Sequence, residues 1–299
     1  MTLAKVAVGI VLLVYVLGKV DISDLVGTLA RVSVESLVVA FLLFGLSRFL
    51  ESVRLQLLAA SSEIRLWTAV EIIFISTFFN NFTASVVGDG YKVIALNRWV
   101  KQWKNSVFVV LAERVLGVFT IAVIGTLLFI ANPDLVELLA DAIGIEGSLY
   151  NWMAAFFVLL AVGLATVLAI SVPGRRRASE LASAMKRLVA GIGVRRWLLA
   201  FLFSVLSQVA LAAMVFQLVI VFGGAIGFAD NLLVMLLAYV TAYVPITIGS
   251  LGIREGAIVL GLSLFAVPYP AALAAALVSR VIIYLYAAAA GVWWAARKS

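Results

Sequence analysis

Charged residues interrupt several apolar runs of this sequence, and their types favour the binding of an anion. Arg48 and Glu51 stand in one run, Glu113 and Arg114 in another, and Arg280 in a third. A charge at mid-depth in a bilayer costs roughly 2.5–3.5 kcal/mol on insertion scales, so such residues normally pair or face a cavity. Adjacent residues on a helix do not face each other, so Glu113 and Arg114 must find partners on other elements. The pattern predicts a charged interior shared between helices, which is either a cavity where guanidinium groups bind phosphate or a set of purely structural ion pairs.

The composition indicates a membrane protein and removes several kinds of chemistry. Hydrophobic residues fill 65% of the 299 positions and charged residues 12%, whereas a soluble domain is about half apolar. The chain has no Cys and no His, which removes thiolate and His-based catalysis and the commonest transition-metal ligands. We therefore expect no catalytic residue, metal site, cofactor or enzyme activity. The net charge of +7 is expected to collect in cytoplasmic loops and does not indicate nucleic-acid binding.

Two further apolar runs are broken by glycines that stand beside charged residues. One break covers residues 80–93 and the other covers residues 244–257. Backbone freed at membrane depth must be buried in protein or line a watery cavity, because hydrocarbon offers no hydrogen-bond partner. We therefore expect both breaks to belong to a site. The break residues are Asn80, Asn81, Gly88 and Gly90 in the first and Pro245, Gly249 and Gly252 in the second.

The unbroken runs predict full membrane spans, and the charges of the loops predict their direction. A crossing at either broken run would put basic loops outside, whereas a re-entrant hairpin keeps Arg65 and Arg98 on one face, as the positive-inside bias requires. The expected fold is all-α, a polytopic protein of the cell membrane with six full spans, two oppositely inserted re-entrant helical hairpins, and cytoplasmic N- and C-termini. The six spans are expected at about residues 3–17, 34–58, 105–130, 150–172, 197–222 and 268–294.

The two broken regions resemble each other. Residues 88–92 and the following Glu113-Arg114-Val115 match residues 249–255 and the following Ser279-Arg280-Val281. Because the two units enter from opposite faces, the match predicts an inverted repeat, the general plan of secondary transporters with broken helices near the midplane. We expect a single transmembrane domain, residues 1–299, whose repeat halves are about 1–145 and 146–299.

Three blocks of sequence, in order, are similar to those of a known family. They are Phe79-Asn80-Asn81-Phe82 leading to Val87-Gly88-Asp89-Gly90-Tyr91-Lys92, then Ala112-Glu113-Arg114-Val115-Leu116-Gly117, and finally Pro245 to Glu255. The chain resembles, over nearly its whole length, the lysylphosphatidylglycerol synthase transmembrane-region family, flippase-like integral membrane proteins of bacteria and archaea. The resemblance implies a polytopic domain that moves phospholipid or lipid-linked groups between leaflets. Some members are fused to a soluble domain that aminoacylates phosphatidylglycerol.

The sequence also departs from the family pattern. Thr83 and Ala84 stand where a Pro is usual, Val87 replaces the first Gly, and Lys92 takes the place of an Arg. In the second block Ser250 stands where a second Gly is usual. The backbone of the first turn is therefore less firmly predicted than that of the second.

These observations favour a lipid transporter, or flippase, for an anionic phospholipid or lipid-linked phosphate, working through a charged central cavity. Alternatives are an ion-coupled carrier of a small anion, a non-catalytic membrane partner of a glycosyltransferase or lipid synthase, and an intramembrane enzyme with Asp89 or Glu255 as base. The expected partner is membrane lipid with an anionic headgroup, alongside a homo-oligomer or a separate synthase or glycosyltransferase. The residues expected to bind substrate are Arg48, Asp89, Lys92, Glu113, Arg114, Arg254, Glu255 and Arg280.

The interior charges are expected to leave one positive charge in surplus, which suits a phosphate. The expected interior bases and acids are Arg48, Arg54, Lys92, Arg114, Arg254 and Arg280 against Glu51, Glu71, Asp89, Glu113 and Glu255.

Overall fold

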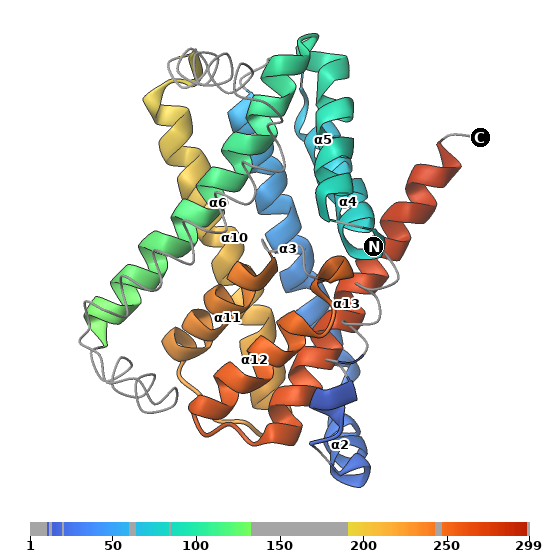
Figure 1. The fold of residues 1–299 in the computed structure, drawn as a ribbon, viewed down its shortest axis with the longest axis vertical. Coiled ribbons are helices and arrows are strands. Elements are labelled where there is room, and N and C mark those ends of the chain that lie inside the picture. Colours follow the sequence, from blue (N-terminus) through green and yellow to red (C-terminus); the bar gives the residue numbers. More distant parts are fainter. Residues whose placement is uncertain are drawn as a thin grey trace.

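The structure, a computed structural model, describes residues 11, 14–19, 21–59, 64–83, 85–132, 191–242 and 247–297. These residues form helices and no strands, which confirms the predicted all-α class (Figure 1). In chain order the helices are α2 (Ile22–Leu29), α3 (Val34–Ala59), α4 (Leu66–Phe82), α5 (Ser85–Val100), α6 (Trp103–Ala131), α10 (Val194–Val221), α11 (Phe228–Ala242), the short 3₁₀ helix η1 (Ile248–Ser250), α12 (Ile253–Leu264) and α13 (Tyr269–Ala296).

Four of the described helices, α3, α6, α10 and α13, are long and apolar enough to cross a membrane. They contain 26 to 29 residues, more than the ~20 that a crossing requires. Their ends differ from the predicted spans by no more than three residues. The prediction of a multi-pass membrane protein is therefore confirmed, whereas the spans expected at about residues 3–17 and 150–172 lie largely or wholly outside the described residues.

Helices α3 and α10 lie side by side and antiparallel (Figure 1). Near one end of the pair, the Gln217 amide donates to the Ser36 carbonyl oxygen over 3.2 Å. Near the other end, Arg54 Nη1 donates to Ser204 Oγ over 3.0 Å. A late residue of each helix thus meets an early residue of its partner. Helix α6 packs on one side of this helix pair and α13 on the other.

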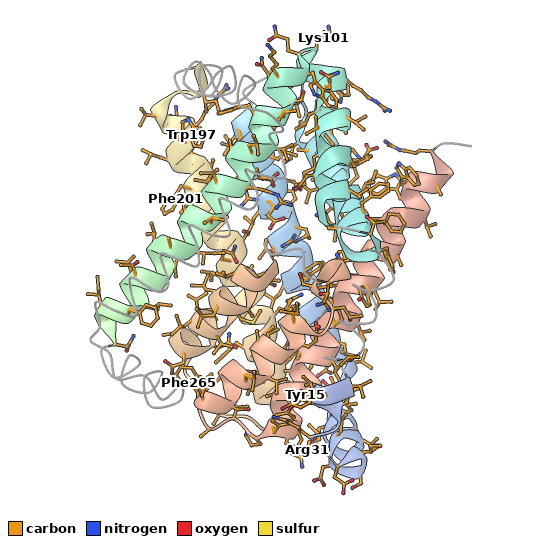
Figure 2. All side chains as sticks on the ribbon, viewed as in Figure 1. Tyr15, Arg31, Lys101, Trp197, Phe201 and Phe265 are labelled. Atoms are coloured by element: carbon orange, nitrogen blue, oxygen red, sulfur yellow. The ribbon has the colours of Figure 1, made fainter. Side chains whose placement is uncertain are left out.

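Helices α4 and α5 form a hairpin whose free ends lie at one end of the molecule. They contain 17 and 16 residues and only Thr83 and Ala84 separate them, so their outer ends come to the same level. Ile64, just before α4, and Val100, the last residue of α5, belong to one hydrophobic cluster with Val107 of α6 and Trp197 of α10. Lys101 marks this end in Figure 2. Each helix is shorter than a crossing requires.

Helices α11 and α12 form a second hairpin, whose free ends lie at the opposite end of the molecule. The loop before α11 meets the loop after α12, since a methyl group on Gly224 would lie 2.9 Å from Val267 Cγ1. Phe265 marks this end in Figure 2. The inner end of the hairpin includes Gly249, and a methyl group there would lie 2.7 Å from the Asn81 carbonyl oxygen. The two hairpins therefore point at each other and meet at their breaks.

Helix α13 packs closely against α10 and α12 because its first half is built from small residues. Ala271, Ala272, Ala274, Ala275 and Ala276 are each at most 2% exposed. Within a membrane, small side chains let helix backbones approach and gain van der Waals contact. The charged Arg280 follows about one turn later, so this packing fixes where its side chain enters the interior.

Candidate anion-binding site

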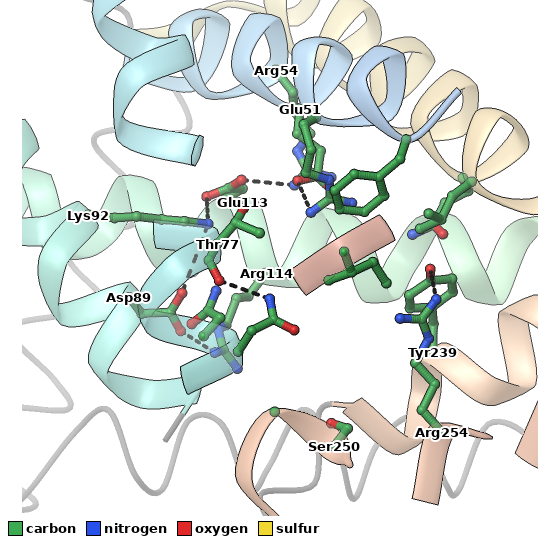
Figure 3. Close-up of a pocket in the computed structure, with 18 of the residues that line it drawn as sticks. Glu51, Arg54, Thr77, Asp89, Lys92, Glu113, Arg114, Tyr239, Ser250 and Arg254 are labelled. Carbon is green, nitrogen blue, oxygen red and sulfur yellow. Dashed lines mark hydrogen bonds and ion pairs between the residues drawn. The ribbon is translucent and has the colours of Figure 1, made fainter. Parts of the chain in front are cut away.

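A cavity of about 240 Å³ lies where the two hairpins meet (Figure 3). Side chains from both hairpins and from all four long helices line it. Seven of the eight residues expected to bind substrate are among them, and the eighth, Glu255, contacts the lining residue Arg280. The seven are Arg48, Asp89, Lys92, Glu113, Arg114, Arg254 and Arg280. Sequence spacing thus located the residues that the fold brings together, and their role in binding stays a prediction.

The break residues have different positions. Asn80, Asn81 and Gly249 line the cavity, whereas Pro245 lies outside the described residues. The Asn81 amide donates to the Thr77 carbonyl oxygen over 2.8 Å, within its own helix. A methyl group on Gly88 would overlap the Asn80 side chain, so this glycine lets α4 and α5 approach closely. In the first break, Gly88 is needed because a side chain there would overlap α4. In the second break, Gly249 is needed because a side chain would overlap Asn81 and because its φ of +58° favours glycine.

Five charged residues form a network at the first hairpin, which we call the Glu113 cluster. Glu113, 2% exposed, accepts from Arg54 Nη2 over 2.9 Å and from Lys92 Nζ over 3.0 Å. Asp89 pairs with Arg114 and lies 4.0 Å from Lys92 Nζ. Glu113 and Arg114 therefore have partners on other helices, as predicted. Three bases share two carboxylates, so the cluster has one positive charge in surplus.

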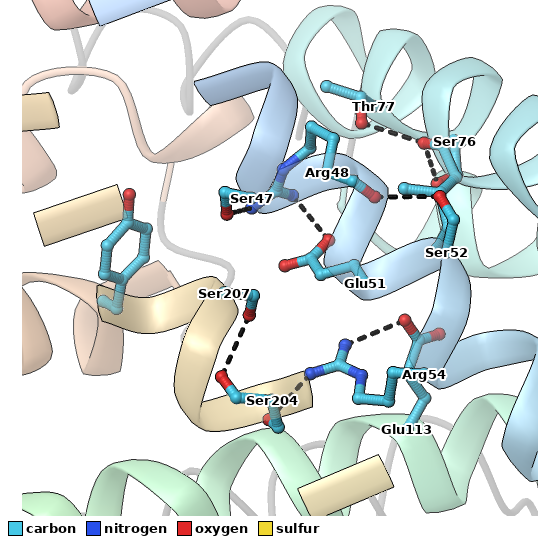
Figure 4. A network of polar contacts seen from close by, with 12 residues as sticks. Ser47, Arg48, Glu51, Ser52, Arg54, Ser76, Thr77, Glu113, Ser204 and Ser207 are labelled. Carbon is cyan, nitrogen blue, oxygen red and sulfur yellow. Dashed lines mark hydrogen bonds and ion pairs between the residues drawn. The ribbon is translucent and has the colours of Figure 1, made fainter. Parts of the chain in front are cut away.

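Serine and threonine hydroxyls pack beside this cluster between α3, α4 and α10 (Figure 4). Ser52 Oγ donates to the Arg48 carbonyl oxygen over 2.8 Å, and Ser207 Oγ donates to the Ser204 carbonyl oxygen over 3.0 Å. Arg48 also pairs with Glu51 over 2.8 Å within α3. Because the Ser52 and Ser207 hydroxyls donate within their own helices, these two small polar residues can be buried here with their donors satisfied.

The second hairpin is held by Glu255 and Arg280. Glu255 Oε2 accepts from the Gly252 backbone N–H over 2.7 Å at the start of α12. Its Oε1 accepts from Arg280 Nε over 2.6 Å. Arg280 also donates to the Gly249 carbonyl oxygen over 2.9 Å and to the Ser250 carbonyl oxygen over 3.3 Å. One guanidinium thus satisfies backbone freed by the break, as hydrocarbon could not.

Ser250 adopts the left-handed conformation, with φ of +55°. Residues with a β-carbon rarely do so, and glycine is the usual occupant. Ser250 is also the position where the sequence departs from the Gly of the family pattern. The turn therefore keeps its shape although a strained residue occupies it.

The two hairpins contain equivalent ion pairs. Asp89 of α5 pairs with Arg114 of α6, and Glu255 of α12 pairs with Arg280 of α13. The partners are 25 positions apart in both cases, and a glycine follows each acid. In each unit the second hairpin helix thus pairs with the long helix directly after it. This equivalence supports the predicted inverted repeat, which stays a prediction.

Arg254 has different surroundings from the other bases of the cavity. It is 5% exposed, and its Nη2 donates to the Tyr239 hydroxyl over 2.9 Å. Its guanidinium also lies 4.9 Å from the Tyr239 ring centroid, a cation–π contact. Among the described residues no carboxylate pairs with Arg254. Sequence reasoning missed Tyr239; the only available signal was a hydroxyl in an apolar run, which needs a partner when buried.

The predicted charge balance needs a correction, because Glu71 does not line the cavity. It pairs with Arg297, whose side chain is 52% exposed, near the end of α13. Without Glu71, the six interior bases of the described chain face four acids, so the surplus is two positive charges and not one. The cavity is therefore more strongly suited to an anion than the sequence predicted.

These features define a class: a polytopic helical membrane protein with a charged cavity between two opposed helical hairpins. Residues 2–291 match the family described as the lysylphosphatidylglycerol synthase TM region. The chain belongs to this family, which confirms the resemblance seen in its sequence, and the apolar helices fit a lipid-related membrane protein. No curated protein matches the chain.

Proposed function

We propose that the protein is a lipid transporter that moves an anionic phospholipid or lipid-linked phosphate between leaflets. The observation that carries this proposal is the cavity itself, which combines a surplus of positive charge with walls of apolar helices. Buried charges without full compensation are expensive, and they normally mark an ion or substrate pathway in membrane proteins. A headgroup phosphate would supply the missing negative charge.

The volume of the cavity supports a headgroup as the bound part. About 240 Å³ is below the range of roughly 300–1,000 Å³ that is usual for pockets enclosing a drug-sized molecule. A phosphate and its neighbouring atoms fit, whereas acyl chains do not. The chains would therefore stay in the bilayer while the headgroup passes between the hairpins.

The proposed topology places both hairpins in the membrane as re-entrant elements that enter from opposite faces. The open ends of the two hairpins lie at opposite ends of the molecule, and their breaks touch in the middle. Basic residues favour the cytoplasmic side, which assigns the Lys101 end and the C-terminus to the cytoplasm. The bases at that end are Arg65, Arg98, Lys101, Lys104, Arg195, Arg196 and Arg297, against Lys19 and Arg31 at the other.

We further propose that the protein acts without catalysis. In the described part of the chain, each interior carboxylate accepts from a base, Glu51 from Arg48 and Glu255 from Arg280 among them. A general base needs a free carboxylate within reach of the reacting proton. Pairing of this kind supports a binding and transport site over an intramembrane enzyme.

The small cavity also supports a second candidate, a carrier of a small water-soluble anion, since free phosphate would fit the same space. Vesicles containing the protein separate the two. A tail-labelled fluorescent phospholipid is loaded in both leaflets, and a membrane-impermeant reductant is added outside. We expect the protein to move labelled lipid from the inner to the outer leaflet, so that the reductant quenches more than the outer-leaflet fluorescence. In protein-free vesicles, the control, only the outer-leaflet label should be quenched. Uptake of labelled phosphate without lipid movement would instead favour the carrier.

A further inference from the structure

Arg254 is the one interior base of the described chain that no carboxylate neutralises. It is 95% buried, because its exposed fraction is 5%. Removing a charge from water costs several kcal/mol even after relaxation, and a hydroxyl dipole offsets only part of this cost. The other interior bases have carboxylate partners, for example Lys92 with Glu113 and Arg280 with Glu255. The charge of Arg254 is therefore available to a ligand.

Three residues that line the cavity, Arg254, Arg48 and Tyr239, have hydrogen-bond donors without a partner. Arg254 Nε and Arg48 Nε are both buried without an acceptor. The Tyr239 hydroxyl accepts from Arg254, so its own proton is free to be donated. Buried donors are normally satisfied, and each orphan costs about 1–3 kcal/mol. An oxyanion placed among these three side chains would accept from the Tyr239 hydroxyl and offset the charge of Arg254.

Apolar side chains line the cavity together with these donors. Phe44, Leu211 and Ile283 line the same cavity, and Figure 3 shows Arg254 and Tyr239 at the end away from Lys92 and Asp89. A second negative charge at this end would find no further unpaired base. The apolar side chains instead suit the carbon atoms next to a phosphate ester.

We propose that Arg254, Tyr239 and Arg48 form a site for a single-charged phosphodiester, which we call the Arg254 site. It rests on the proposed transport function, because the ligand would be the headgroup phosphate of the transported lipid. Arg254 would bind two phosphate oxygens with its fork, as a guanidinium can and an ammonium cannot. The Glu113 cluster, in which each base already contacts a carboxylate, would shape the cavity and would not hold the phosphate.

The test measures binding to the purified full-length protein in mild detergent by native mass spectrometry and by competition with a fluorescent phospholipid. The probes are phosphatidylglycerol, diacylglycerol, which has no phosphate, and inorganic phosphate. We compare the wild type with R254Q and R254K, and with R98Q as the matched control, since Arg98 is an exposed base outside the cavity. Size exclusion and thermal unfolding verify that each variant is folded.

We expect R254Q to weaken phosphatidylglycerol binding on the order of tenfold to a hundredfold, the range for hydrogen bonds to a charged group. R254K should lie between R254Q and the wild type, whereas R98Q and diacylglycerol binding should not change. Equal phosphatidylglycerol binding by folded R254Q and wild type would overturn the site while leaving transport intact. If R254Q does not fold, R254K decides: wild-type affinity in R254K would overturn the proposed fork.

Inorganic phosphate separates the site from the transport proposal. If the wild type binds phosphate through Arg254 but neither binds nor moves phosphatidylglycerol, the anion site stands and lipid transport is wrong. If phosphatidylglycerol is bound and moved equally by R254Q, transport stands and the Arg254 site is wrong.

Discussion

Replacing Glu113 by Gln should destabilise the protein more than any surface charge change. The amide keeps the shape of the carboxylate but removes its charge, so it can no longer neutralise Arg54 and Lys92. Both bases would remain buried, at 6% and 9% exposure. The remaining carboxylate of the cluster, Asp89, is already paired with Arg114. Three bases would then share one carboxylate.

The expected loss follows from the burial of the pairs. Breaking a buried ion pair by removing one partner costs about 3–5 kcal/mol, because an uncompensated charge stays in the interior. For a chain of this size each kcal/mol lowers the unfolding temperature by about 2–4 °C, so the shift should be on the order of 10 °C. The measurement is thermal unfolding in one detergent, followed by tryptophan fluorescence.

The matched control is Glu71→Gln. Glu71 also loses an arginine partner, but Arg297 is 52% exposed, and exposed pairs contribute about 0–1 kcal/mol. We expect this variant to unfold within a few degrees of the wild type. An equal shift for E113Q and E71Q would refute the reasoning that burial makes the Glu113 cluster essential.

A second substitution tests whether charge, and not shape, causes the loss. Lys92→Met in the E113Q background removes one base together with the acid and restores the original surplus of the cluster. Residues in one network typically show coupling of about 0.5–3 kcal/mol. The double variant should therefore be more stable than the sum of the single changes predicts, whereas strict additivity would contradict the network.

Three further predictions concern the breaks and the topology. Gly249→Ala should lower stability by at least about 1 kcal/mol, because the φ of residue 249 is +58° and the new methyl group would meet Asn81. In the same thermal assay, an unchanged unfolding temperature would contradict the contact between the hairpins. Arg280→Lys should slow lipid movement more than it lowers stability. A lysine ammonium cannot reproduce the several hydrogen bonds by which the Arg280 guanidinium binds Glu255 and the Gly249 carbonyl oxygen at the second break. Lipid movement at the wild-type rate would reject a role of Arg280 in transport. Single cysteines at Ser61 and Trp103 should react with an impermeant reagent from the same side, and labelling from opposite sides would reject the first re-entrant hairpin.

The sequence by itself determined the class of the protein, its described long helices and the charged residues of the cavity. Hydropathy predicts a span locally, because each apolar residue is transferred into the bilayer largely independently of its neighbours. A charge or a glycine within such a run is costly wherever the helix finally packs. Arg114, Gly249 and Arg280 could therefore be singled out without knowledge of the fold, and the three family blocks added the family.

Only the tertiary structure decided which charges meet. Glu113 binds Arg54 and Lys92, Glu71 pairs with Arg297 outside the cavity, and Arg254 donates to the Tyr239 hydroxyl. Each outcome depends on how helices distant in sequence are rotated about their axes and placed against one another. Packing of this kind is a property of pairs of helices, and the residues of one helix do not specify it. The size of the charge surplus in the cavity, two and not one, therefore became visible only when the helices were assembled.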